Sequence, residues 1–191
     1  RWDIVKLLCI GSITTAIISI LALKIIDPIS KNFNHFISIS IGISVLLTAI
    51  SLLFRAKILK WVQQNSHFLP SGSNLKVATI VVGAVIGVLV TVSSIGAGAI
   101  GATLILILYP HLKPAQVAGT DIAYAVPLTA LAGIGHWWLG NVHFDLLFGL
   151  LLGSVPAIWI GAKLSSSLSE RATRNTLAAT LFLVGIKLVS S

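Results

Sequence analysis

Most of this chain consists of apolar stretches about twenty residues long, separated by short polar segments. A helix of about twenty apolar residues is long enough to cross the hydrocarbon core of a bilayer. We expect such spans at residues 4–26, 36–54, 115–139, 144–164 and 173–189. The pattern therefore predicts an all-α, polytopic transmembrane helical bundle whose main partner is the lipid bilayer.

Charged residues are too few to cover a water-facing surface, because they make up 9% of the chain against about 25% in soluble domains. The net charge is +8, but the basic residues lie at the ends of apolar stretches rather than along one face with aromatic residues between them. This placement argues against a nucleic-acid partner. The single cysteine, Cys9, cannot form an internal disulfide, and no metal or cofactor motif is present, so we predict no metal and no cofactor.

The apolar stretch at residues 77–109 is too long for one span. It contains Gly96, Gly98 and Gly101, and each glycine weakens a helix by about 1 kcal/mol relative to alanine. We therefore predict two helical pieces joined by a break, in a broken or re-entrant helix that enters the membrane and returns.

The distribution of positive charge favours this hairpin. If the stretch returned, one side of the membrane would carry ten basic residues and the other three; a single crossing would give seven and six. Only the first division satisfies the positive-inside rule. The three on the minority side are Lys24, Lys31 and Lys187.

An internal repeat is visible at an offset of 142 to 143 residues. Trp2-Asp3 and Gly11-Ser12 match Phe144-Asp145 and Gly153-Ser154, and Gly42 matches Gly185. With the hairpin, the two repeats are inverted, as in many transporters. We predict that residues 1–54 are the remainder of a first repeat, 55–76 a cytoplasmic linker loop and 77–191 a second repeat. The same spacing predicts about seventy further residues before Arg1.

The glycine-rich break is the first candidate site. Backbone groups freed inside a membrane need partners, and a helix starting after the break would point free N–H groups at an anion. The predicted substrate-binding residues here are Ser93, Ser94, Gly96, Gly98 and Gly101. Close packing of helices through small residues is the alternative.

Thr120 and Asp121 form the second candidate site. An ionisable residue within a span is a functional candidate, and a carboxylate beside a bound anion takes up a proton more readily. We predict that Thr120 contacts substrate and that Asp121 couples transport to protons. The alternative is that either residue caps a helix starting nearby.

Three further residues, Pro127, Ser154 and Pro156, could line a pathway, because a proline inside a span frees a backbone carbonyl. They could equally be tolerated kinks. His136 could relay protons, but the adjoining Trp137-Trp138 favours an interfacial belt.

The order of several motifs resembles a known family: Gly96 to Gly101, Tyr109-Pro110, Gly119 to Ile122, Gly133 to His136 and Gly153 to Pro156. Together they resemble the sulfite exporter TauE/SafE family, also called toluene sulfonate uptake permeases. The resemblance implies a transporter with two related halves, no enzymatic activity, a bacterial cytoplasmic membrane location, and sulfite or organosulfonates as substrates.

We therefore predict a secondary transporter, expected to export a small sulfur oxyanion, with proton coupling and a homodimer left open. The first alternative is a permease or channel for another small solute. A second is an intramembrane enzyme using Ser94 with His136, and a third is a structural membrane subunit.

Overall fold

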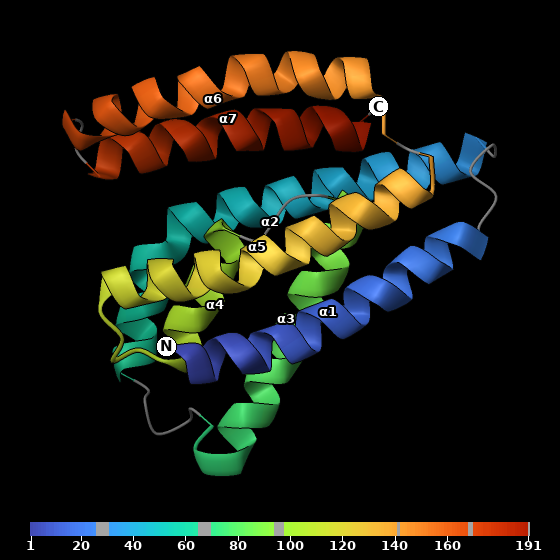
Figure 1. Cartoon of the computed structure of the whole chain (residues 1–191). Helices are drawn as coiled ribbons and strands as arrows, with labels where there is room; N and C mark the ends of the chain where they lie inside the picture. The colour runs from blue at the N-terminus through green and yellow to red at the C-terminus, as the bar shows by residue number, and fades with distance from the viewer. Residues whose placement is uncertain (26–30, 65–69, 94–97, 141, 168–169, 191) are drawn as a thin grey trace.

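A computed structural model describes residues 1–25, 31–64, 70–93, 98–140, 142–167 and 170–190 (Figure 1). Over these ranges the chain forms helices and no strand, as predicted. In chain order they are α1 (Trp2–Ile25), α2 (Lys31–Gln64), α3 (Gly72–Ser93), α4 (Ala99–Leu108), α5 (Pro114–Trp138), α6 (Phe144–Ser167) and α7 (Glu170–Ser190). By length and composition, α1, α3, α5 and α6 can each cross a membrane.

The linker predicted at residues 55–76 is shorter than expected. Helix α2 continues to Gln64 and α3 begins at Gly72, so helix covers both ends of the predicted loop. Lysine, arginine and glutamine are good helix formers, and a helix can continue beyond the apolar segment that would lie in the bilayer. The polar composition marks where the apolar spans end rather than where the helices end.

Helices α1 and α3 pack backbone to backbone through glycines. A Cβ at Gly83 would lie 2.5 Å from the carbonyl oxygen of Leu8, and one at Gly87 would overlap the carbonyl oxygen of Ser12. Gly11 of α1 meets the α3 backbone in the same way, at Ile80. Gly83 and Gly87 are four residues apart, the spacing that lets membrane helices approach closely. This part of the glycine content therefore serves packing.

Replacing Gly83 with leucine should destabilise the fold strongly. The new side chain would meet backbone that cannot rotate away, and overpacking of a close contact costs about 1–3 kcal/mol or more. The loss of stability would be measured by thermal unfolding in detergent, with size-exclusion chromatography as the readout of folded protein. Gly133→Leu is the matched control, because a Cβ there meets nothing within 4 Å. Equal losses in both variants would contradict the packing described here.

The core lies between α1, α3, α4 and α5. Its fully buried members include Leu8, Ile86, Ile105, Tyr124 and Leu128. The hydroxyl groups of Thr79, near the start of α3, and Tyr109, directly after α4, are 2.8 Å apart. The chain therefore runs away from this pair of residues along α3 and comes back to it along α4. The two predicted helical pieces are present, and their re-entrant placement in a membrane stays a prediction.

Helices α2 and α7 meet at the two glycines that the internal repeat pairs. A Cβ at Gly42 would lie 3.3 Å from the carbonyl oxygen of Gly185, and one at Gly185 would lie 3.3 Å from that of Gly42. Figure 1 shows that α2 and α7 run in opposite directions, and so do α1 and α6. An inverted duplication requires these directions; the duplication itself stays a prediction.

Candidate functional site

The start of α5 is fixed by its first residues. Pro114 occupies the first helical position, and the side-chain oxygen of Gln116 accepts a hydrogen bond from the Lys113 N–H at 3.1 Å. Proline is favoured at this position because its missing N–H would have no partner there. Asp121 therefore lies two turns inside α5, and the alternative that Thr120 or Asp121 caps a helix is wrong.

The start of α4 lies against the same part of α5. Gly98 is the N-cap residue and supplies no side-chain cap, so the first-turn N–H groups have no intrahelical partner. Gly101, in this first turn, is buried. A Cβ on Gly101 would overlap the Tyr124 hydroxyl and lie 2.5 Å from Oδ1 of Asp121. Only glycine fits this contact between α4 and α5.

Asp121 is the buried acidic group at this contact. It is 8% exposed, and Tyr124 beside it is fully buried. The Tyr124 hydroxyl hydrogen-bonds with the Asp121 carboxyl group. The carboxyl oxygen Oδ1 of Asp121 is buried and has no hydrogen-bond partner among the described residues. A buried polar atom without a partner is costly, so Oδ1 marks a place where a proton or ligand would be stabilised.

The hydroxyl groups predicted to hold an anion are engaged by the backbone. Ser93 Oγ donates to the Leu89 carbonyl at 2.6 Å, and Thr120 Oγ1 donates to the Gln116 carbonyl at 2.7 Å. Either hydroxyl would have to rotate before donating to an anion. Thr120 is one residue from Asp121, whereas Ser93 ends α3.

The remaining predicted site residues do not join this cluster. Ser94 and Gly96 lie outside the described residues. Gly98 begins α4 but is exposed, and Pro127 lies on an exposed face of α5. Ser154 and Pro156 are exposed on α6. That Pro127, Ser154 and Pro156 line a pathway stays a prediction.

The described residues thus place an uncapped helix start, a glycine contact and a buried carboxylic acid together inside a bundle of apolar helices. Comparison with known proteins identifies the bundle: the family model described as Sulfite exporter TauE/SafE matches residues 1–188. The chain belongs to the TauE/SafE family. Its predicted identity as a membrane transporter rather than an enzyme is confirmed, and the protein is an integral, multi-pass membrane protein.

A curated relative supports the same class. This TauE/SafE chain is 34% identical over 189 residues to "Probable membrane transporter protein YjnA" of Bacillus subtilis (strain 168). The match covers 99% of this chain and 74% of the relative. No solved structure matches the chain.

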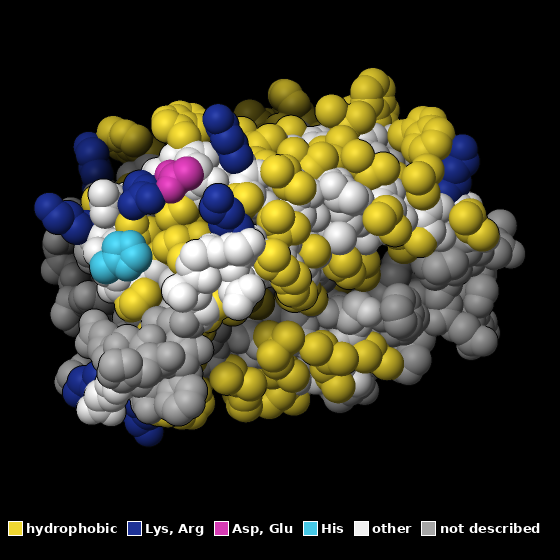
Figure 2. All heavy atoms as spheres, turned by 90° about the horizontal axis from the view of Figure 1, so that it is seen from below, with side chains coloured by type: hydrophobic (Ala, Val, Ile, Leu, Met, Phe, Trp, Pro, Cys, Tyr) yellow, Lys and Arg dark blue, Asp and Glu magenta, His cyan; other side chains and the backbone are white. Residues whose placement is uncertain are grey.

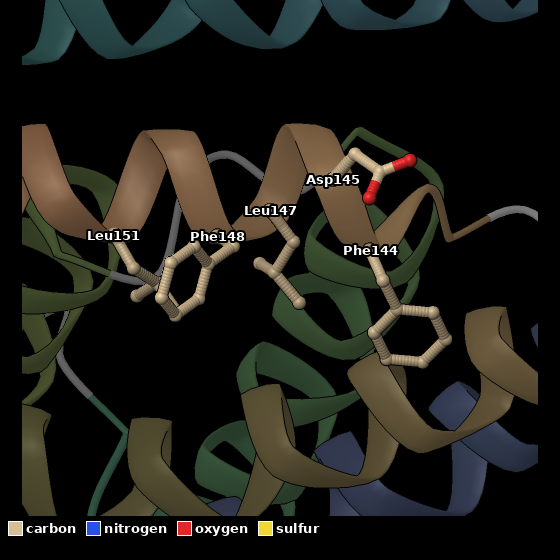
Figure 3. A pocket seen from close by; sticks show the side chains of 5 residues that line it. All are labelled: Phe144, Asp145, Leu147, Phe148 and Leu151. Carbon is tan, nitrogen blue, oxygen red and sulfur yellow. The ribbon is translucent and has the colours of Figure 1, made fainter.

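A hollow in the TauE/SafE protein lies on α6, away from Asp121. It has a volume of about 450 Å³ and is lined by Phe144, Asp145, Leu147, Phe148 and Leu151. Figure 3 shows the four apolar side chains pointing to one side of α6 and Asp145 to the other. The apolar lining does not suit an oxyanion, and none of the predicted substrate-binding residues contributes to it.

Tyr124 is the residue of this TauE/SafE site that the sequence did not predict. It follows Thr120 by four residues and Asp121 by three, and these spacings place all three side chains on one face of a helix. That spacing is the signal that could have identified it. Its contact with Gly101 could not be predicted, because α4 and α5 are separate helices.

Proposed function

We propose that this TauE/SafE transporter carries a small sulfur oxyanion, sulfite or an organosulfonate, and that Asp121 moves a proton with it. The observation that carries the proposal is the unpartnered Oδ1 of buried Asp121, which lies against the first turn of α4 at Gly101. Helix starts and protonated carboxyl groups both offer hydrogen-bond donors to an anion.

The site suits an anion because the first turn of α4 supplies N–H groups that have no partner within that helix. The positive end of the helix dipole and the first-turn N–H groups favour negative charge. An ionised Asp121 would repel an anion at this place, whereas a protonated Asp121 adds a donor. Binding of the anion and of the proton therefore support each other, and the two cross the membrane in the same direction.

The membrane potential favours export of the anion. An inside-negative potential contributes about 2.3 kcal/mol per charge at 100 mV to the outward movement of negative charge. When a sulfite dianion leaves the cell together with one proton, one net negative charge still moves outward. The proposal therefore combines export with proton co-transport.

Flux into proteoliposomes tests the substrate class. Sulfite, a small alkanesulfonate, sulfate and acetate would be supplied separately at equal concentration, with protein-free liposomes as the control. We expect saturable flux of sulfite or the sulfonate, and little flux of acetate. Preference for acetate would contradict the proposed substrate, and flux that does not saturate would indicate a channel.

Basic residues indicate the orientation in the bacterial cytoplasmic membrane that we propose. Lys6, Lys76 and Lys113 lie near the starts of α1, α3 and α5, whereas Lys24 ends α1. Figure 2 shows Lys and Arg side chains gathered toward one end of this face of the molecule, over a largely apolar surface. The positive-inside rule places that end in the cytoplasm.

Cysteine labelling would check this orientation. In a Cys9→Ser background, Lys24→Cys should react with a membrane-impermeant thiol reagent added to intact cells, and Lys113→Cys should react only after permeabilisation. The reverse pattern would show that the orientation is inverted.

A further inference from the structure

The end of α5 contacts three different helices through three consecutive residues. His136 Nε2 lies 2.8 Å from the backbone carbonyl oxygen of Thr91 in α3. The Trp137 ring packs edge-to-face with Phe144 of α6, at 6.3 Å between centroids. The ammonium group of Lys24, at the end of α1, lies 3.9 Å from the centre of the Trp138 ring. The sequence favours an interfacial belt here, with a proton relay through His136 as the alternative, and the structure adds a specific contact for each residue.

The contact made by His136 joins α5 to the last described turn of α3 through a backbone carbonyl. Thr91 lies in the last turn of α3 that the structure describes, two residues before Ser93. A carbonyl can only accept, so Nε2 of His136 carries the hydrogen and donates it. Thr91 is fully buried, so this hydrogen bond forms away from water, where a hydrogen bond is stronger.

Helix α5 thus contacts both the last described turn of α3 and the first turn of α4. His136 holds the last turn of α3, and Asp121 with Tyr124 lies against the first turn of α4 at Gly101. Fifteen residues separate Asp121 from His136, which is about 22 Å along a helix at about 1.5 Å per residue.

We propose that His136 is a positioning residue that fixes the last described turn of α3 against α5. It acts through the Thr91 carbonyl and does not touch the substrate or carry its proton. Its effect on transport rests on the proposed function; its effect on α3 does not. Removal of its donor should therefore loosen the last turn of α3 and leave the distant Asp121 site in place.

Thiol labelling tests the structural part without any substrate. Val92→Cys in the Cys9→Ser background reports on the end of α3. His136→Phe should raise its labelling rate about fivefold, the population change expected for loss of one typical hydrogen bond. His136→Gln keeps an N–H donor at a similar distance from the backbone, so the labelling rate at position 92 should stay near its original value. Trp138→Leu, which removes a contact to α1 instead, is the matched control and should leave the labelling rate at position 92 unchanged.

Hydrogen exchange at the end of α3, followed by mass spectrometry, gives the same comparison without a cysteine at position 92. Faster exchange in His136→Phe alone supports the proposal. The proposal would be overturned if His136→Phe left the labelling and exchange rates unchanged. It would also be overturned if His136→Gln raised these rates as much as His136→Phe. In the flux assay, His136→Phe should lower the maximal rate with an unchanged KM, and His136→Gln should restore it. A proton relay would instead fail in both variants.

Discussion

Replacing Gly101 with alanine should reduce transport by about 5- to 150-fold. The added Cβ would overlap the Tyr124 hydroxyl and crowd Oδ1 of Asp121, and both side chains are buried. Overpacking of such a contact costs about 1–3 kcal/mol, which corresponds to that range when the whole cost falls on the transporting arrangement. Initial rates of sulfite or sulfonate flux in proteoliposomes would measure it.

Gly98→Ala is the control for this experiment. Gly98 lies in the same glycine-rich stretch, has φ −74°, and would place a Cβ with nothing within 4 Å. It should keep near-normal flux. Equal impairment in both variants would show that flexibility of the stretch matters rather than the contact at Gly101. Tyr124→Phe, which removes the overlapping oxygen, should partly restore the Gly101→Ala protein.

Asp121→Asn should abolish the component of transport driven by a pH gradient while binding of the anion survives. Asparagine has nearly the same volume as aspartate but does not take up a proton, and it removes the charge that would repel the anion. We expect affinity to change by less than about tenfold, or about 1.4 kcal/mol. The measurement is flux at equal and at opposed pH across the membrane, together with equilibrium binding.

The matched control for Asp121→Asn is Asp145→Asn, which changes an exposed carboxyl group at the start of α6. It should keep normal coupling. Unchanged pH-driven flux in Asp121→Asn would remove Asp121 from the mechanism, and loss of coupling in both variants would show that the effect is not specific to the buried group.

The spans of the fold could be predicted because hydropathy reports them directly. The expected span at residues 4–26 is α1, and the expected span at 144–164 lies within α6. The helix pieces on both sides of the break followed from the glycines. The continuation of α2 as far as Gln64 could not be predicted in this way, because a helix can continue through polar residues beyond the apolar segment.

The site was only partly visible in the sequence. Asp121 could be identified because a carboxylate within an apolar stretch is unusual. The closeness of Gly101 to Asp121 and the hydrogen bond from His136 to Thr91 depend on how separate helices pack. No local pattern along one helix encodes such distances. The sequence predicts Ser93 as a substrate-binding residue because it lies beside the break, but its hydroxyl donates a hydrogen bond to a carbonyl of its own helix.

The most direct test is to locate the bound anion. Bromomethanesulfonate has the proposed headgroup, and its bromine gives an anomalous X-ray signal in a crystal of the protein. The account predicts a bromine peak beside the first turn of α4, with the sulfonate next to the contact between Gly101 and Asp121, and no peak there in Gly101→Ala. A peak only at another place, such as the apolar hollow on α6, would contradict it.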